Sequence, residues 1–274
     1  MQIKAKILHH KKVKPGYYRV ALIACGIAKE AQAGQFVEIK VNDAWEPLLR
    51  RPFSIHRTQG SAFEVLYEVV GQATRLLSRK KPGEYLEVIG PLGKGFDFCS
   101  DSYAPLLVAG GMGVAPLVFL AEKMAASNKR ATVLLGARDK NSILCEEVFR
   151  KLGFSVKIAT DNGSRGFRGY VSGLLEHELA AGSFMPQLVI YACGPRPMLQ
   201  EISRISRHHN IPAWVSLEEH MACGLGVCLG CVVDTVDGYQ RVCKEGPVFE
   251  ARRIIWKSKS AKGERLCPQS LLFR

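Results

Sequence analysis

The sequence predicts a β + α/β protein with three parts: an N-terminal antiparallel barrel, a doubly wound parallel sheet, and a small C-terminal cysteine-rich subdomain. Three observations support this order. Short alternating segments fill residues 1–100, continuous apolar runs separated by helical stretches follow from Pro105, and four cysteines gather near the C-terminus. A chain of 274 residues is long enough to bury a core in each of two modest domains.

Residues 1–100 are expected to form the barrel. Apolar and polar residues alternate over residues 17–25, 35–41 and 63–70, as in half-buried strands, and residues 85–90 predict a further strand. Pro-Gly pairs at 15–16 and 82–83 mark turns between them. Strands this frequent, with one short helical candidate at residues 73–79, favour a small antiparallel barrel.

Residues 101–217 are expected to form the parallel sheet. The runs LLVAG, TVLLGA, VKIAT and QLVIYACG are short and continuously apolar, as in strands buried on both faces. Helical stretches are predicted at residues 116–126, 142–152, 173–181 and 197–209, and a last strand at 212–217. Alternating strand and helix predicts a parallel sheet, with the domain boundary in the polar stretch near residues 98–104.

Residues 218–256 carry the most specific motif, HMACGLGVCLGC followed by a hairpin and RVC. The spacing C-x4-C-x2-C, with a fourth cysteine after a short loop, is the plant-type pattern for a [2Fe–2S] cluster. Gly224, Gly226 and Gly230 allow the tight curl that this spacing needs. A hairpin turning at Asp237-Gly238 brings back the last cysteine. The predicted cluster ligands are Cys223, Cys228, Cys231 and Cys243.

A structural zinc site is the alternative for the same cysteines. Zinc sites also use four thiolates, but usually as two CxxC pairs, and this segment has one. That alternative would make the chain a non-enzymatic interaction module. A disulfide framework is disfavoured, because the N-terminus has no signal-peptide h-region and we expect a reducing, cytoplasmic setting.

The formal charge of +13 requires an explanation. Nucleic-acid binding is not expected, because the basic residues are spread along the chain and no aromatic-interleaved patch stands out. An anionic dinucleotide or an acidic protein partner explains the charge equally well. Residues 104–121 are uncharged but contain glycines and prolines, so we expect strand, turn and helix there and no membrane span. Residues 257–274 form a basic tail that we expect to be loosely held.

Two motifs in the predicted barrel have the chemistry of a flavin-nucleotide site. The run Arg51-Pro52-Phe53-Ser54 is expected to follow a strand, where a guanidinium can pair with a pyrophosphate and a serine hydroxyl can bond a flavin ring nitrogen. Residues 71–74, at the start of the short helix, offer backbone N–H groups to a second phosphate. A surface arginine beside a strand and an ordinary strand-to-helix turn are the simpler alternatives.

Two further motifs end strands of the predicted sheet. VAGGMGVAP, residues 108–116, opens a helix whose unpaired N–H groups and dipole favour a phosphate, although Pro116 replaces the third Rossmann glycine. A glycine turn used only for packing is the alternative. YACGPRPM closes another strand at its carboxyl end, where ligands bind in open α/β sheets, and makes Cys193 a candidate wall of a nicotinamide pocket. No acid–base dyad is predicted, and His9, His10, His208 and His209 are expected in exposed stretches.

The order of RPFS, GGMGVAP, CGP and four cysteines resembles the ferredoxin-reductase superfamily. More narrowly, SLEEHMACGLGVCLGC with RVCKEGPVF resembles the electron-transfer subunits of dihydroorotate dehydrogenase B, over roughly residues 3–252. The resemblance implies FAD, a [2Fe–2S] cluster, NAD, and an FMN-containing catalytic subunit that oxidises dihydroorotate, in a heterotetramer of two of each. Electrons would pass from FMN through the cluster and FAD to NAD⁺, in pyrimidine biosynthesis. A reductase subunit serving ferredoxin or a hydrogenase is the close alternative.

The resemblance also implies the residues of each site. Ala73 stands where family members usually carry a glycine, and its small side chain still lets the backbone approach a phosphate. FAD would be held by Arg51, Pro52, Phe53, Ser54, Leu66, Tyr67, Glu68, Gly71, Ala73 and Thr74. NAD would be bound by Gly110, Gly111, Gly113, Cys193, Gly194 and Pro195.

Overall fold

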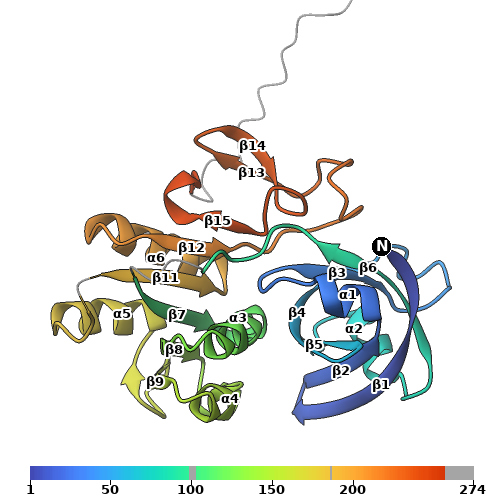
Figure 1. Cartoon of the computed structure of the whole chain (residues 1–274), viewed down its shortest axis with the longest axis horizontal. Helices are drawn as coiled ribbons and strands as arrows, with labels where there is room; N and C mark the ends of the chain where they lie inside the picture. The colour runs from blue at the N-terminus through green and yellow to red at the C-terminus, as the bar shows by residue number, and fades with distance from the viewer. Residues whose placement is uncertain (99–102, 186, 257–274) are drawn as a thin grey trace, which may run out of the picture.

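The computed structural model describes residues 1–98, 103–185 and 187–256. The barrel, the parallel sheet and the cysteine segment follow one another as predicted, and the fold class is confirmed (Figure 1). The predicted basic tail at 257–274 lies outside the described residues.

The N-terminal barrel closes in the strand order β1-β2-β5-β4-β3-β6, and every neighbouring pair is antiparallel. Side chains alternate between a buried interior and the surface, as in the run Ala5, Lys6 and Ile7 of β1. Its elements are β1 (Gln2–Lys14), β2 (Tyr17–Ile23), α1 (Cys25–Glu30), β3 (Phe36–Lys40), β4 (Arg51–Gln59), β5 (Ala62–Glu68), α2 (Gln72–Ser78) and β6 (Tyr85–Leu92).

Three details of the barrel differ from the prediction. Strand β1 was missed because lysines occupy its exposed positions, and only Ala5 and Ile7 are buried along it. Cys25 begins α1 instead of ending a strand. The barrel therefore has a second short helix besides the one at residues 72–78. Arg51 begins β4, which places the RPFS run inside a strand and not after one.

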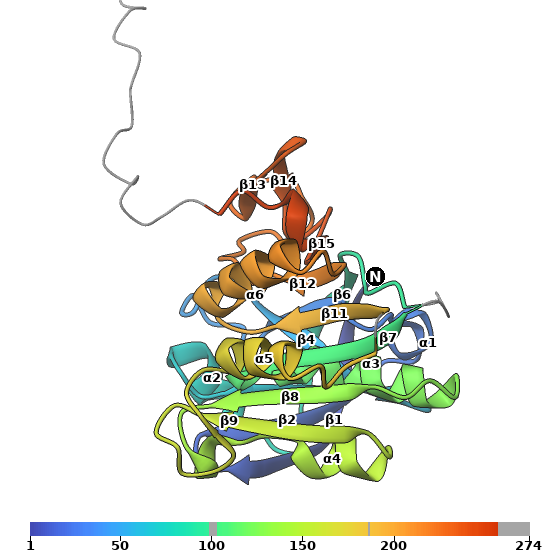
Figure 2. The ribbon, with the colours of Figure 1, turned by 90° about the vertical axis from the view of Figure 1, so that its left-hand side faces the viewer.

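The parallel sheet has the order β10-β9-β8-β7-β11-β12-β15. Helices α3 and α4 pack on one face and α5 and α6 on the other, which is the doubly wound arrangement (Figure 2). The strands are β7 (Ala104–Gly110), β8 (Thr132–Ala137), β9 (Ser155–Thr160), β10 (Phe167–Arg168), β11 (Leu188–Cys193), β12 (Ala213–Ser216) and the antiparallel edge strand β15 (Val248–Glu250). The helices are α3 (Val114–Ala126), α4 (Glu146–Lys151), α5 (Val171–Ala180) and α6 (Arg196–His208).

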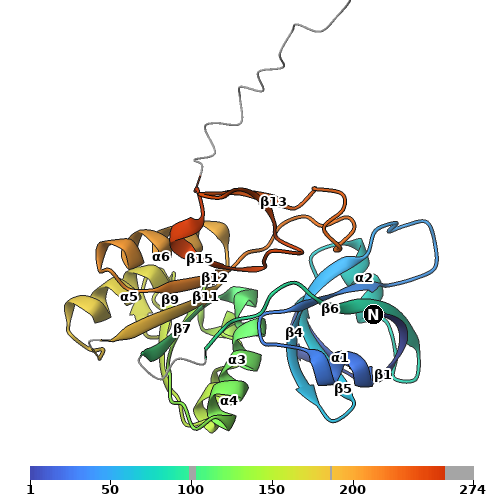
Figure 3. The ribbon, with the colours of Figure 1, turned by 45° about the horizontal axis from the view of Figure 1, so that its top comes forward.

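Residues 218–243, hereafter the cysteine arm, run as a loop to the hairpin of β13 (Val232–Thr235) and β14 (Gly238–Arg241) (Figure 3). Thr235 pairs with Gly238, so the turn lies at residues 236–237, one residue before the predicted turn. Cys231 and Cys243 are buried in the core that α6 and β12 also line. The arm is therefore fixed to the sheet by packing as well as by β15.

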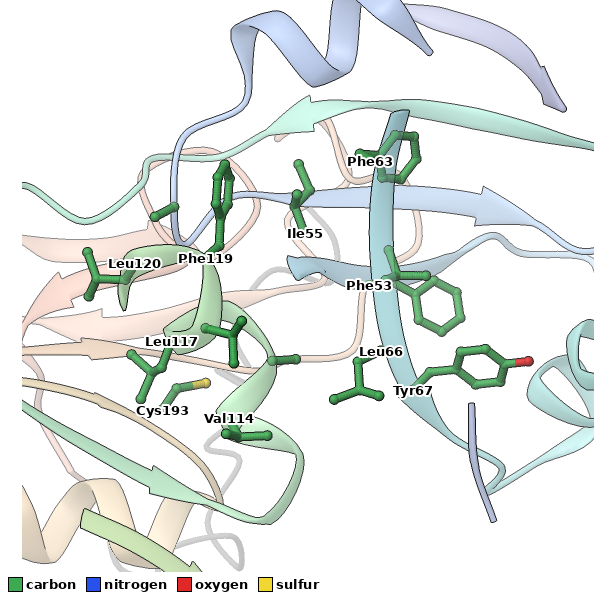
Figure 4. Close-up of a cluster of buried hydrophobic side chains, with 14 of the residues drawn as sticks. Phe53, Ile55, Phe63, Leu66, Tyr67, Val114, Leu117, Phe119, Leu120 and Cys193 are labelled. Carbon is green, nitrogen blue, oxygen red and sulfur yellow. The ribbon is translucent and has the colours of Figure 1, made fainter. Parts of the chain in front are cut away.

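A second apolar core joins the barrel to the sheet. Helix α3 contributes Val114, Leu117 and Phe119 to a cluster that also contains Ile55 and Phe63 of the barrel (Figure 4). Burial of this many large side chains across the seam is expected to hold the two domains in a fixed relation. Among the described residues, no helix combines the length and apolarity needed to cross a membrane.

Candidate redox site at the junction of the three parts

A cavity of about 650 Å³ opens where the barrel, α3 and the start of the cysteine arm meet. A cavity of this size can hold a large part of a dinucleotide cofactor. All ten residues predicted to hold FAD line it: Arg51, Pro52, Phe53, Ser54, Leu66, Tyr67, Glu68, Gly71, Ala73 and Thr74.

The sequence analysis missed the other side of this cavity. Met112 lines it from the turn before α3 and Ala115 from the first turn of that helix, and residues 216–221 line it from the end of β12 and the start of the arm. Their place in the chain could have indicated these residues. Residues 216–221 connect the last parallel strand to the first cysteine, so they have to pass the carboxyl edge of the sheet, where ligands bind.

Arg51 is anchored at the cavity before any ligand binds. Its Nη1 donates hydrogen bonds to the carbonyl oxygens of Leu49 at 2.7 Å and Arg50 at 3.1 Å. A guanidinium oriented in this way loses little further freedom when it pairs with a phosphate.

The start of α2 is closed by Thr74. Its Oγ1 accepts hydrogen bonds from the N–H groups of Val70 and Gly71, both at 3.0 Å. These two N–H groups are engaged within the turn. Phosphate donors in this segment would therefore come from the backbone of residues 72–74, at the positive end of the helix.

Aromatic side chains form the barrel wall of the cavity. The ring of Tyr67 stacks on Tyr18 at 5.8 Å between centroids and meets Phe53 edge-on at 5.8 Å. His10 Nδ1 lies 2.7 Å from the Lys80 carbonyl oxygen, which can only accept, so Nδ1 carries the proton. Nε2 then accepts from the Tyr67 hydroxyl at 2.9 Å. His10, half-buried in an otherwise exposed stretch of β1, thus supports Tyr67 from behind.

The loops after β7 and β11 pack tightly on each other. A Cβ at Gly113 would lie 2.1 Å from the Cys193 carbonyl oxygen, and one at Gly110 would meet the Met198 sulfur at 2.5 Å. Only glycine allows this approach, so the motif has a packing role whatever it binds. Gly111, in the short η1 turn (Gly111–Gly113), is exposed.

The Cys193 side chain is closed off from solvent. It is buried, and burial raises the pKa of its thiol. A buried neutral thiol packs as a small apolar side chain. Any contribution of this turn to a nucleotide site would come from the backbone of Gly194 and from Pro195, which is exposed.

The four predicted ligands lie as two pairs. Cys223 is hydrogen-bonded to Cys228, and Cys243 to Cys231. Backbone N–H groups point at the sulfurs: those of Leu225 and Cys228 reach Cys223 Sγ at 3.4 and 3.5 Å. Burial opposes ionisation of Cys223, but these N–H groups prevail and lower its pKa to about 6. Burial and the neighbouring Cys231 raise the pKa of Cys243 to about 12.

This pairing fits a two-iron cluster better than one zinc ion. A mononuclear zinc site needs four donors around one centre, whereas each iron of a [2Fe–2S] cluster takes two thiolates. The N–H···S bonds are also those that tune such clusters.

The cysteine arm is in direct contact with the barrel at Glu38. Gly224 has a φ of +67°, and a Cβ there would lie 2.6 Å from Glu38 Cγ. Glu38 is 1% exposed, and among the described residues neither carboxylate oxygen has a hydrogen-bond partner. Burial raises its pKa to about 7 against the opposing charge of Arg50. The barrel strand that pairs with β4 therefore also supports the first cluster ligand.

The outer surface of the arm is apolar. Val227 is 79% exposed and Tyr239 is 74% exposed, which is unusual for such side chains in a group. The exposed apolar side chains of this surface, hereafter the arm face, are Leu225, Val227, Leu229, Val236 and Tyr239.

Comparison with known proteins agrees with this geometry. Residues 218–255 match the iron-sulfur cluster binding domain of dihydroorotate dehydrogenase B, and residues 107–204 match the oxidoreductase NAD-binding domain. A chain in the structure of an NADH-dependent reduced ferredoxin-NADP oxidoreductase superimposes with a TM-score of 0.82 at 28% identity, covering 93% of this chain and 90% of that one.

Two relatives are named as subunits of one enzyme. The electron transfer subunit of dihydroorotate dehydrogenase B (NAD(+)) from Desulforamulus reducens is 42% identical over 260 residues, which cover 92% of this chain and 98% of that one. A homolog of that subunit from Aquifex aeolicus is 37% identical over 257 residues, 93% of this chain and 98% of that one. This chain therefore belongs to the family of dihydroorotate dehydrogenase B electron-transfer subunits.

Proposed function

We propose that this chain takes electrons from an FMN-containing subunit that oxidises dihydroorotate and delivers them to NAD⁺. The observation that carries this proposal is the shared cavity. It is lined by the flavin-type motifs of the barrel, by α3 of the nucleotide domain, and by Met221, which lies two residues before the first cluster cysteine. The balance is dihydroorotate + NAD⁺ → orotate + NADH + H⁺.

The cofactors supply chemistry that side chains lack, because a flavin takes up a hydride as two electrons and a [2Fe–2S] cluster carries one electron at a time. The chain supplies position. Arg51 and the first turn of α2 would hold the FAD pyrophosphate, and the aromatic wall of Phe53 and Tyr67 would flank the ring system. Gly110, Gly111, Gly113, Gly194 and Pro195 would bring the NAD backbone to the edge of the sheet.

The cluster ligands would be Cys223, Cys228, Cys231 and Cys243. Cys228 is exposed while Cys231 and Cys243 are buried, so one side of the cluster would face outward and the other would face the protein. We infer that the arm face docks on the FMN-containing subunit, in a cytoplasmic heterotetramer of two copies of each. We propose that residues 1–100 form the FAD domain, residues 101–217 the NAD domain and residues 218–256 the cluster subdomain.

The test is reconstitution of both subunits. Purified anaerobically, the chain should contain about one FAD and two iron atoms. Co-expressed with an untagged FMN-containing dihydroorotate dehydrogenase subunit, it should co-purify and confer dihydroorotate-dependent reduction of NAD⁺. Zinc in place of iron, or a stable complex that reduces no NAD⁺, would overturn the proposal.

A second candidate is a reductase subunit that serves ferredoxin. The observation that favours it is the similarity to the NADH-dependent reduced ferredoxin-NADP oxidoreductase chain, which covers nearly the whole length of both. The same reconstitution separates the two candidates, since this one predicts NADH-dependent ferredoxin reduction and no dihydroorotate activity.

A further inference from the structure

His56 lies on the seam between the two walls of the cavity. It is on β4, two residues after Ser54, and its side chain is 1% exposed. Strand β4 packs along α3, the helix whose first turn contributes Ala115 to the opposite wall. The residue is therefore placed between the motif expected to hold the flavin and the helix expected to approach the nicotinamide.

One hydrogen bond crosses the seam at this point. His56 Nδ1 lies 3.0 Å from the carbonyl oxygen of Ala115. A carbonyl can only accept, so Nδ1 is the donor and the tautomer is fixed. Burial, followed by the charges of Arg57 and Arg19, lowers the pKa of His56 to about 3. The imidazole is thus neutral at physiological pH.

The helix turn that receives this bond is short of internal bonds. Ala115 and Pro116 lie in the first turn of α3, where backbone N–H groups have no intrahelical acceptor, and no side chain caps this end of the helix. Met112 and Ala115 are also the residues of this region that line the cavity. A bond from the barrel is therefore well placed to fix this turn relative to the flavin strand.

We propose that His56 is a positioning residue for hydride transfer, which acts through the Ala115 carbonyl to set the distance between the flavin wall and the nicotinamide wall. The inference rests on the proposed function, since it presumes flavin on β4 and nicotinamide near α3. Hydride transfer is sensitive to such placement, because an error of about 1 Å can cost on the order of a hundredfold in rate.

A second polar contact on the same seam provides a matched control. Arg57 Nη2 lies 2.9 Å from Glu122 Oε1, also between β4 and α3. Glu122 is seven residues beyond Ala115, about 10 Å further along the helix. Arg57→Gln should weaken the seam without moving the first turn of α3.

The experiment compares His56→Leu, His56→Asn and Arg57→Gln in the full chain with FAD and cluster. Reduction of the flavin by NADH is followed by anaerobic stopped flow with normal and 4-deuterated NADH. Leucine removes the donor, whereas the asparagine Nδ2 can occupy the position of Nδ1. His56→Leu should slow hydride transfer about tenfold to a hundredfold, with an increased isotope effect and little change in the KM for NADH. His56→Asn and Arg57→Gln should remain close to wild type.

A readout without flavin supports or contradicts the same claim. In the flavin-free chain, amide hydrogen exchange in the first turn of α3 should be faster in His56→Leu but not in His56→Asn. An unchanged hydride-transfer rate in His56→Leu, or equal losses in all three variants, would overturn the inference. If His56→Leu does not fold, a His56→Asn rate that falls about tenfold or more below wild type has the same consequence. Wild-type flavin that NADH cannot reduce would instead refute the proposed function.

Discussion

The cavity and the cysteine arm differ in what determines their shape. The cavity walls are strands and helices whose backbone bonds and buried aromatic rings are complete without a ligand. Residues 218–231 form neither helix nor strand, and the described bonds within this loop run mainly from backbone N–H groups to cysteine sulfur. The first site is built by the core, whereas the second has the form of a loop wrapped around a metal.

This difference implies that the two sites can be lost separately. A metal site seldom persists without its metal, because the binding free energy is part of the folding free energy of the loop. The cavity should depend on it less, since most of its walls belong to the barrel and α3, and the arm contributes only residues 218–221. Loss of the cluster should therefore disconnect the partner from a flavin site that still works with NADH.

The strongest test of this separation is Cys228→Ser. We expect loss of the cluster and a more than roughly hundredfold drop in dihydroorotate-dependent NAD⁺ reduction, because a serine hydroxyl replaces an iron-binding thiolate. Flavin content and NADH-dependent reduction of an artificial dye should stay near wild type. Iron analysis, the visible spectrum and both assays measure this.

Cys25→Ser is the matched control, because Cys25 is also exposed but lies on α1 of the barrel. It should keep both iron and activity. A full iron complement in Cys228→Ser would contradict the ligand assignment. Simultaneous loss of FAD would show that the arm is needed to build the cavity.

The next largest effect is expected for Arg51→Ala on the cavity side. Loss of a charge-assisted bond to the pyrophosphate removes about 1.5–3 kcal/mol, or roughly tenfold to a hundredfold in FAD affinity. The cluster should remain in Arg51→Ala while FAD binding weakens, whereas in Cys228→Ser the cluster should be lost while FAD is kept. Fluorescence titration of FAD into the flavin-free chain measures it. Arg79→Ala, at the exposed end of α2, should bind FAD normally, and equal affinity in both variants would argue against the phosphate role of Arg51.

The sequence analysis succeeded where local chemistry determines structure. The cysteine spacing indicated an iron–sulfur segment, which the match at residues 218–255 confirms. The motifs RPFS and residues 66–74 indicated one wall of the cavity, because each is a short run with a specific geometry. It could not find His56 or Glu38, whose roles depend on contacts with Ala115 and Gly224 far along the chain. It marked Cys193 as a candidate wall of the nicotinamide pocket, but a strand end does not predict how deeply that side chain is buried.

A third prediction concerns the seam and leaves electron transfer at neutral pH unchanged. Burial lowers the pKa of His56 from 6.5 in the unfolded chain to about 3. Between about pH 6.5 and pH 3 the unfolded state therefore binds a proton that the folded state does not bind. The free energy of unfolding should fall as the pH drops through this range. His56→Asn should lack this part of the acid sensitivity. Urea unfolding of the two chains between pH 7 and pH 4 compares them, and parallel curves would contradict the assigned burial.

The smallest expected effect tests whether the arm face is a docking surface. Tyr239 on the arm and Tyr170 before α5 are exposed to almost the same extent, 74% and 72%, so their truncation removes similar areas of free surface. Exposed tyrosines at interfaces often contribute more than 1 kcal/mol to binding, and Tyr239→Ala should weaken partner binding about tenfold. Tyr170→Ala should leave it unchanged, and neither should alter dye reduction by NADH. If calorimetry gives the same partner affinity for Tyr239→Ala and Tyr170→Ala, the partner does not dock on the hairpin. A loss confined to Tyr239→Ala would place the partner on the hairpin of the cysteine arm, next to the loop that carries Cys223, Cys228 and Cys231.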